Sequence, residues 1–357
     1  MITFVFLLLF SCAKPPALLT VVDWEATPRL PSPSAGTYAR VKMAPQDPGV
    51  RQVMGTRDWD ASLGGAAAGI ALNLVHRRGT LTPPEIREAA WRAGWPYPVR
   101  SVHTAGTALG SPAPQKVKQQ LASVPGQAAI GLVRARSEGQ SQDIWVLLTS
   151  IPRRDIGVFP RQLPRGSRLA LPSLEGVRFA VSDPDGRLYE GHLDVGWSVE
   201  ATNEGEWLVE MVDNEGVVAR FPIYVGMVPP QFSLLSGGDR ADNTEAAKGQ
   251  VQEVLGRVRD AYGLRGPQVD TLLQNAIRWV QSDPTVSAST IAKRVGFDEG
   301  RVWRYDCTQP TVELCLDPLV WDPRARPFLM SSSLLMGVGA DVVPNGIHVT
   351  LLLGLES

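Results

Sequence analysis

The stretch Trp321-Asp322-Pro323-Arg324-Ala325-Arg326-Pro327-Phe328-Leu329, followed by Leu335-Met336-Gly337-Val338-Gly339-Ala340, decides how the last part of the chain is interpreted. The first piece indicates the end of a helix, which we expect to run from Pro310 to Val320. The second indicates the start of a strand, Leu335 to Val343. Asn345-Gly346 is a favoured hairpin dipeptide and predicts a tight turn into a final strand, Ile347 to Leu353.

Length and composition limit the number of domains and the kinds of ligand that the protein can be expected to bind. The chain has 357 residues, which favours two or three domains. A hydrophobic content of 44% and a charged content of 20% are typical of a globular protein. The formal net charge is -1, from 35 basic and 36 acidic residues, so no global field attracts nucleic acid. Three cysteines and four histidines leave little material for a metal site, and we expect no cofactor.

The apolar run near the N-terminus indicates that the protein is exported to the cell envelope. Residues 3–10 are nearly all apolar, and the run is too short for a membrane-spanning helix, which needs about 20 residues. Its length is typical of the apolar region of a signal peptide. The run ends Leu9-Phe10-Ser11-Cys12, which resembles the lipidation signal of bacterial lipoproteins. We therefore expect residues 1–12 to form a lipoprotein signal peptide with Cys12 as the lipidated residue.

Two features depart from that pattern, because no Lys or Arg precedes the apolar run and Phe10 is bulky for its place. An ordinary secretory signal and a buried N-terminal strand are the alternatives. Lipidation at Cys12 would supply more than one acyl chain, which makes a membrane anchor stable. Ala13 follows the cysteine, and by resemblance to lipoprotein sorting this favours the outer membrane over the inner. The face of the membrane stays open.

The rest of the chain predicts an α+β multidomain fold. Residues 13–50 contain many prolines and predict an extended tether. Residues 51–150 combine helical periodicity with two late strands, as in a helix-rich α/β domain. Residues 151–230 contain short strands between turn clusters and predict a small immunoglobulin-like β-sandwich. Residues 231–245 form a linker, and residues 246–357 a last domain. The first and last domains share a helix-rich start and a paired-strand finish, which fits a distant duplication.

With Cys12 assigned to lipid, Cys307 and Cys315 remain for pairing. In an oxidising compartment a disulfide between them would persist, so we expect one. Two free buried thiols are the alternative.

The last domain resembles the CAP superfamily, the cysteine-rich secretory, antigen 5 and pathogenesis-related proteins, in its bacterial secreted form. The resemblance covers residues 251–353 and rests on the order of three segments: Val254 to Leu264, Val269 to Trp279, and Asp322 to Ala340. It implies a C-terminal α-β-α sandwich. The whole layout resembles bacterial proteins, apparently of the myxobacterial type, with a helix-rich region and a sandwich-like module ahead of the CAP domain.

The departures from the family pattern predict a degenerate cleft, formed by Asp322, Ala325 and Arg326. In the family that the last domain resembles, this cleft carries two histidines that can hold a divalent metal. Ala325 occupies the place of the later histidine. The segment Ser282 to Ser287 corresponds to the place of the earlier one and contains no histidine. Imidazole nitrogens give such a cleft its affinity for transition metals. We therefore expect no bound metal and no catalytic residue here.

Other residues give weaker signals. His76 lies beside Arg77 and Arg78 at the end of an expected helix, where a positive charge is favourable, and His348 lies in the last expected strand. His103 and His192 are isolated, and we interpret none of the four as a ligand. Trp91 and Trp95 bracket a helix end, and Trp303 and Trp321 bracket the degenerate cleft. Core packing is the favoured interpretation of these rings, and binding of glycan or peptide by stacking is the alternative.

These observations together predict a non-catalytic lipoprotein of the cell envelope that acts as a binding or scaffolding module. Its expected partners are a membrane, through the lipid anchor, and an envelope protein or glycan. The alternative is a cell-wall hydrolase that uses an unrecognised site, and an adhesin-like protein differs from the first reading only in its partner.

Overall fold

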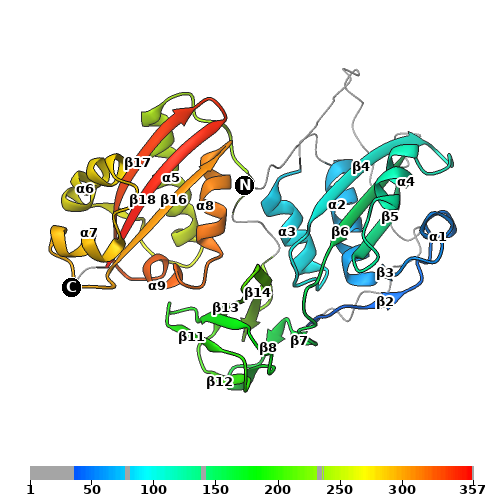
Figure 1. Cartoon of the computed structure of the whole chain (residues 1–357), viewed down its shortest axis with the longest axis horizontal. Helices are drawn as coiled ribbons and strands as arrows, with labels where there is room; N and C mark the ends of the chain where they lie inside the picture. Colours follow the sequence, from blue (N-terminus) through cyan, green and yellow to red (C-terminus); the bar gives the residue numbers. More distant parts are fainter. Residues whose placement is uncertain (1–35, 77–80, 138–141, 231–234, 236, 356–357) are drawn as a thin grey trace.

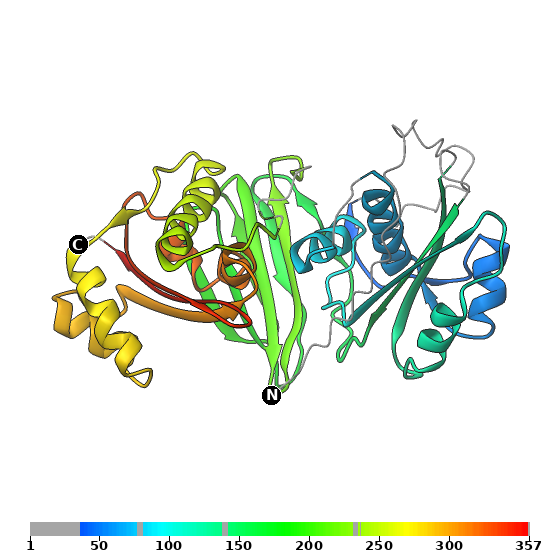
Figure 2. The same cartoon turned by 90° about the horizontal axis from the view of Figure 1, so that it is seen from above.

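A computed structural model of the chain describes residues 36–76, 81–137, 142–230, 235 and 237–355. The predicted signal peptide, the lipidation site Cys12 and residues 13–35 of the predicted tether lie outside the described residues. Three parts are distinct in Figures 1 and 2: an N-terminal domain (36–150), a β-sandwich (151–230) and a C-terminal domain (237–355). The β-sandwich lies between the other two when the molecule is seen from above (Figure 2).

The N-terminal domain has three layers, α-β-α. Its sheet has the strand order β2-β3-β5-β6-β4, and only the β3–β5 pairing is parallel. Helices α2 and α3 pack on one face of this sheet, and α1 and α4 pack on the other. The elements are β2 (Lys42–Met43), α1 (Pro48–Met54), β3 (Trp59–Asp60), α2 (Ala61–His76), α3 (Pro83–Arg92), β4 (Ser101–Ala108), α4 (Gln115–Ala122), β5 (Ala129–Ser137) and β6 (Gln142–Ser150).

The predicted tether is wrong for residues 36–50, because these residues belong to the folded body. Strand β1 (Thr37–Tyr38) pairs with β7 (Phe159–Pro160), and β2 joins the N-terminal sheet. Pro48, which the sequence suggested was part of an extended segment, is the first residue of α1. A proline is tolerated there because the first helical N–H has no partner within the helix. The side chain of Asp47 caps the same helix by accepting from the Val50 N–H.

The β-sandwich consists of a five-stranded sheet, β11-β10-β13-β14-β8, and a two-stranded sheet, β12-β9. The rings of Trp197 in β12 and Phe179 in β10 lie 4.9 Å apart between their centroids, so the two sheets face each other. The elements are β8 (Gln162–Leu163), β9 (Ser167–Leu171), β10 (Arg178–Ser182), β11 (Leu188–His192), β12 (Trp197–Ala201), β13 (Gly205–Asp213) and β14 (Gly216–Val225).

The C-terminal domain is a second α-β-α arrangement, with the strand order β15-β17-β18-β16. Helices α5, α8 and α9 pack on one face, and α6 and α7 on the other. The predicted tight turn joins the last two strands, but its two residues are Pro344 and Asn345, because Gly346 pairs with Val343 as the first residue of β18. The elements are α5 (Thr244–Asp260), β15 (Gln268–Val269), α6 (Thr271–Ser282), α7 (Ala288–Val295), β16 (Val302–Gln309), α8 (Val312–Val320), α9 (Arg326–Leu329), β17 (Leu334–Val343) and β18 (Gly346–Leu355).

The two α-β-α domains share one topology. The order β3-α2-α3-β4-α4-β5-β6 in the first corresponds to β15-α6-α7-β16-α8-β17-β18 in the second. The strand orders β3-β5-β6-β4 and β15-β17-β18-β16 also correspond, including the single parallel pairing in each. Helix α9 has no counterpart among the described residues of the first domain. This correspondence supports the distant duplication suggested by the sequence.

The correspondence extends to individual residues at the start of α2 and α6. Asp60 accepts from the Leu63 N–H at 3.2 Å, and Asp270 accepts from the Leu273 N–H at 2.9 Å. Counted from these aspartates, the buried apolar residues fall at the same spacings: Leu63, Ala66, Ala67 and Ile70 in α2, and Leu273, Ala276, Ile277 and Val280 in α6.

Each domain also has a glycine where the helix, α2 or α6, crosses a central strand of the sheet. A Cβ on Gly131 of β5 would collide with the backbone of Leu63, and a Cβ on Gly337 of β17 would collide with the backbone of Leu273. Each helix therefore lies directly against its strand, at a distance that only glycine permits.

One continuous cluster of buried apolar residues runs through all three parts of the molecule. It includes Leu63 of the N-terminal domain, Phe221 of the β-sandwich and Leu316 of the C-terminal domain. Burial of this surface is the main term that stabilises the arrangement. The domains therefore form one packed body rather than separate units on flexible linkers.

Candidate functional site

The segment predicted to form a degenerate cleft lies at a domain joint. Helix α8 ends at Val320, and the chain turns through Asp322 and Ala325 into the short helix α9. Ala325 is fully buried, with 0% of its surface exposed. The turn of the β-sandwich at Gly186 approaches so closely that a Cβ there would lie 3.0 Å from the Arg326 carbonyl oxygen and 3.2 Å from Pro327 Cα. The β-sandwich therefore covers this segment.

Arg326 makes the central contact of the joint. Its Nη2 donates to Oε1 of Glu206 in β13 and to the hydroxyl of Tyr262 at 3.2 Å. The Tyr262 hydroxyl itself donates to Glu206 Oε1 at 2.8 Å. Arg326 is completely buried and Glu206 is 5% exposed. Burial raises the pKa of Tyr262, so this hydroxyl stays protonated and remains a donor.

Arg324 forms a second contact beside the first. It pairs with Glu210 at 2.6 Å and with Glu190 at 2.8 Å, both from the β-sandwich. Glu210 also accepts from Arg220. Asp322 accepts from the Arg324 N–H at 2.9 Å, and burial raises the pKa of its carboxyl. The structure thus brings Asp322, Ala325 and Arg326 together, but against a neighbouring domain.

The two cysteines form the predicted disulfide. Cys307 in β16 and Cys315 in α8 are bonded, with their Cα atoms 5.7 Å apart. The Tyr305 hydroxyl donates to the Cys315 carbonyl oxygen at 2.6 Å. The bond fixes α8, and with it Trp321, to the edge of the C-terminal sheet. Within the described part of the chain, no group of three or more His, Cys, Asp or Glu residues is arranged to hold a metal ion.

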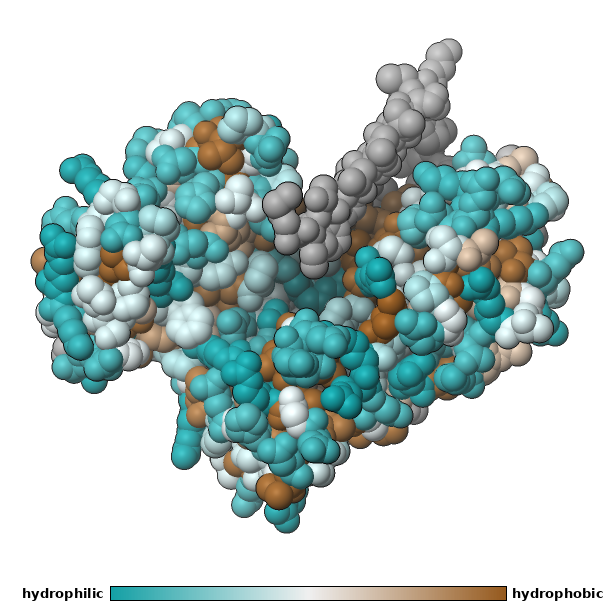
Figure 3. Space-filling view, in the orientation of Figure 1, coloured by the Kyte–Doolittle hydropathy of each residue, from teal (hydrophilic) through white to brown (hydrophobic). Residues whose placement is uncertain are grey.

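A pocket lies where the three parts of the molecule meet, and we call it the junction pocket. Its volume is about 360 Å³. The space-filling view shows three lobes around a central hollow (Figure 3). The N-terminal domain contributes Tyr38, Glu88, Trp91 and Arg92. The β-sandwich and the residues after it contribute Arg161, Glu206, Tyr224, Met227, Pro229 and Pro230. The C-terminal domain contributes Ala261, Tyr262 and Trp321.

Two tryptophans from different domains form one wall. The rings of Trp91 in α3 and Trp321 after α8 meet edge to face, with centroids 4.8 Å apart. The guanidinium of Arg87 lies 4.9 Å from the Trp91 ring and 5.1 Å from the Trp321 ring, and it pairs with both oxygens of Asp317. Trp91 also donates from Nε1 to the Arg220 carbonyl oxygen at 2.7 Å. All three domains are thus joined at this wall.

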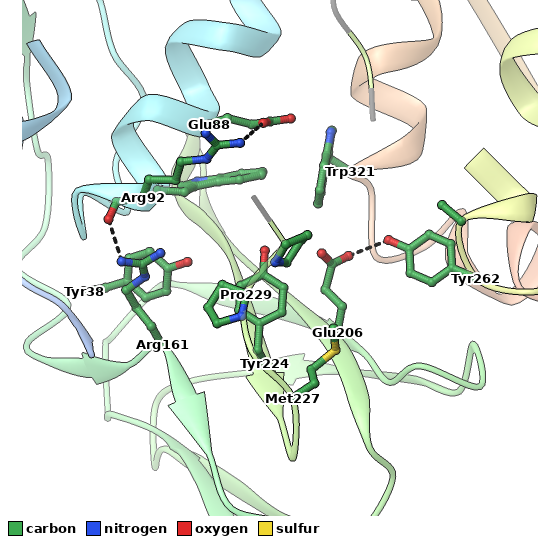
Figure 4. Close-up of a pocket in the computed structure, with 13 residues that line it drawn as sticks. Tyr38, Glu88, Arg92, Arg161, Glu206, Tyr224, Met227, Pro229, Tyr262 and Trp321 are labelled. Carbon is green, nitrogen blue, oxygen red and sulfur yellow. Dashed lines mark hydrogen bonds and ion pairs between the residues drawn. The ribbon is translucent and has the colours of Figure 1, made fainter. Parts of the chain in front are cut away.

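Glu206 and Tyr224 form the floor, as a cross-strand pair of β13 and β14. Burial and the charge of Glu206 raise the pKa of Tyr224, so this hydroxyl is neutral. Figure 4 shows Glu206 and Tyr262 on one side of the pocket and Arg161 and Tyr38 on the other.

Tyr38 and Arg161 form the opposite wall. The Tyr38 hydroxyl donates to the Pro222 carbonyl oxygen at 2.8 Å, and burial raises its pKa. Arg161 Nη1 donates to the Arg92 carbonyl oxygen at 2.5 Å, and its guanidinium lies 5.7 Å from the Tyr38 ring.

The sequence drew attention to two tryptophans of this site, although core packing was the favoured interpretation of both. Trp91 and Trp321 were singled out, and the structure brings them together, whereas Trp95 is a core residue with 0% exposure. Trp303 contacts Phe328 and is not among the residues that line the pocket. Tyr38 was missed because it lies in the predicted tether. Arg161 and Glu206 lie in β-rich sequence with no local motif, and only the assembled domains bring them to one cavity.

Comparisons with known proteins gave partial matches only. No family model matches the chain, and no curated protein matches it. A cysteine-rich secretory protein from Staphylococcus aureus is similar, at 12% identity and a TM-score of 0.27, over 43% of this chain and 56% of that one. An extracellular protein with an SCP domain from Bacillus anthracis is similar at 10% identity and a TM-score of 0.24, over 45% of this chain and 64% of that one. The chain thus spans less than two thirds of each of these proteins.

Proposed function

We propose that this chain is a non-catalytic binding protein of the cell envelope and that its ligand binds in the junction pocket. The observation that carries the proposal is the lining of the pocket by Tyr38, Trp91, Tyr224, Tyr262 and Trp321, five aromatic residues drawn from all three domains. Pockets of this size, lined by rings and a few polar groups, are the usual form of a small-ligand site.

The domain joints support the proposal because they fix the walls of the pocket. Arg326 with Glu206, Arg87 with Asp317, and Trp91 with the Arg220 carbonyl each connect two domains. A site whose walls are held before the ligand arrives loses little conformational entropy on binding. In this proposal the C-terminal domain is CAP-like and the β-sandwich immunoglobulin-like. Both serve as a scaffold for the pocket.

The location in the envelope is proposed from the N-terminal sequence. Lipidation of Cys12 would anchor the chain to a membrane, with the outer membrane favoured by Ala13. In the described residues no helix is both long and apolar enough to cross a bilayer.

The alternative function, a cell-wall hydrolase, is favoured by one observation: the pocket contains two carboxylates, Glu88 and Glu206. Each already has a partner, Arg92 at 3.4 Å for Glu88 and both Arg326 and Tyr262 for Glu206. If the chain is a hydrolase of this kind, it should release soluble fragments from purified peptidoglycan, and Glu206→Gln should abolish the release. Binding without release supports the non-catalytic proposal.

A photo-crosslinking experiment tests the proposal directly. Met227 lines the pocket and is 41% exposed, so p-benzoylphenylalanine in its place would face a bound ligand. Val342 in β17 is 38% exposed, is not among the residues that line the pocket, and is the matched control position. After irradiation of intact cells, mass spectrometry should find a specific adduct at position 227 and not at position 342. No adduct at 227, or the same adducts at both positions, would contradict the proposal.

A further inference from the structure

We infer that the ligand of the junction pocket carries a carboxylate attached to an aromatic or apolar group, and that Arg161 binds the carboxylate. The inference rests on the proposed function, because it assumes that the pocket is a binding site. It adds the chemical class of the ligand and the residue that selects it.

Among the residues that the structure describes, one cation of the pocket lining has no carboxylate partner. Glu88 pairs with Arg92, and Glu206 pairs with Arg326 behind the pocket wall. Arg161 makes no ion pair with any residue that the structure describes. Arg161 is therefore the charged lining residue whose described contacts include no carboxylate, and a ligand with a negative charge would supply one.

The donors of Arg161 are only partly used. Nη1 donates to the Arg92 carbonyl oxygen, but Nε is buried without a hydrogen-bond partner. A buried donor without an acceptor costs free energy, so the protein leaves part of the hydrogen-bonding capacity of this guanidinium unused. Guanidinium and carboxylate groups match in shape and form strong charge-assisted hydrogen bonds.

The remainder of the lining favours a ring rather than a flexible polar chain. Trp91, Trp321, Tyr224 and Tyr262 offer ring faces and edges, and Met227 offers a polarisable side chain. Glu206 already accepts from two groups on Oε1, so few hydrogen-bonding atoms of the pocket remain for a heavily hydroxylated ligand. An aromatic acid satisfies both halves of the site, with its ring among the aromatic walls and its carboxylate at Arg161.

The test compares an acid with its neutral amide. Phenylacetate and phenylacetamide have nearly the same shape and differ in charge. Binding is measured by calorimetry and by the fluorescence of the pocket tryptophans. In the unmodified protein the acid should bind at least about tenfold more tightly than the amide, as expected for a hydrogen-bonded charge pair. Arg161→Gln should remove this preference, so that the ratio of acid to amide affinity falls to about one, and Arg161→Lys should keep part of it.

Arg165→Gln is the matched control, since Arg165 belongs to the same domain, is exposed and pairs with Glu204 outside the pocket. It should leave the acid preference intact. Equal binding of acid and amide by the unmodified protein would overturn the inference and leave the proposed pocket function standing. Failure of both probes to bind would contradict the inference and the pocket function together.

A second pair of probes distinguishes a free acid from the end of a peptide. N-acetyl-Ala-Phe is offered with a free C-terminal carboxylate and with a C-terminal amide. If the peptide acid binds more tightly than phenylacetate and the peptide amide does not, the ligand is a peptide C-terminus. If phenylacetate binds more tightly than either peptide, the ligand is a small aromatic acid. Tighter binding of the peptide amide than of the peptide acid would contradict the role of Arg161.

Discussion

Arg326 of the C-terminal domain donates a hydrogen bond to Glu206 of the β-sandwich, and neither side chain has more than 5% of its surface exposed. Arg326 belongs to the segment where the sequence resemblance predicted a degenerate cleft. Removing one member of a buried ion pair leaves the other charge without compensation in a poorly solvated place. The stability lost when one member of this pair is replaced therefore shows whether the segment is a joint between domains or a cleft.

Arg326→Met should lower the free energy of unfolding by about 3–5 kcal/mol, because Glu206 would keep only the Tyr262 hydroxyl as a partner. Urea denaturation measures the change. Lys42→Met is the control, since Lys42 and Asp58 form an ion pair in which both side chains are well exposed, and it should have no measurable effect. Equal behaviour of the two variants would show that Arg326 does not hold a joint. Replacing both Arg326 and Glu206 by Met should recover part of the loss.

Asp322→Asn tests the buried carboxyl of the same segment through pH. Burial raises the pKa of Asp322 above its ordinary value of 3.8 in the folded chain, so the native state binds this proton more tightly than the unfolded state. The unmodified chain therefore loses stability as pH rises from about 4 through the folded pKa. The stability of the variant relative to the unmodified chain should rise over the same interval, whereas a flat or falling difference would contradict the assignment.

Gly131→Ala and Gly337→Ala test the correspondence between the two α-β-α domains. Each added methyl would collide with the backbone of a helix, at Leu63 or Leu273, so each should destabilise by about 1–3 kcal/mol. Gly249→Ala, in α5 with open space around the new methyl, should instead raise stability by up to about 1 kcal/mol. Thermal or urea unfolding distinguishes the three. If only one of the two glycines is sensitive, the crossing points are not equivalent.

Cys12→Ala tests the proposed anchor. The variant cannot be lipidated at this position, so the protein should move from the membrane fraction to the soluble fraction after cell lysis. Fractionation followed by immunoblotting measures the distribution, with Cys307→Ala as a control that leaves the lipidation site intact. Retention of the Cys12→Ala chain in the membrane fraction would reject the lipid anchor.

Local patterns predicted much of the secondary structure. Helix α2 (Ala61–His76) lies in the part of the chain, residues 51–150, where helical periodicity was expected, since its apolar residues follow the helical period. Strand β4 was missed, because Ser101–Ala108 is rich in small and polar residues. It lies at a sheet edge, and β6 is its single partner among the described strands, so only part of it needs to be apolar.

The site was harder to predict than the fold. Trp91 and Trp321 lie 230 positions apart in sequence. They meet because the N-terminal domain packs against the C-terminal domain where α3 and the end of α8 lie. Asp322 and Ala325 were placed in one segment correctly, but no local signal shows that the β-sandwich covers it. Glu206 looks like one polar residue of an alternating strand. Its role depends on Arg326, which lies 120 residues later.

Fluorine NMR of protein labelled with 5-fluorotryptophan tests whether ligands bind where the three domains meet. Single Trp→Phe variants assign the signals. Addition of phenylacetate or phenylacetamide should shift the signals of Trp91 and Trp321, which line the pocket. The signal of Trp145, which packs in the separate core beneath α1 and α4, should not move. Unchanged signals from both pocket tryptophans, or equal shifts at Trp145, would contradict the account.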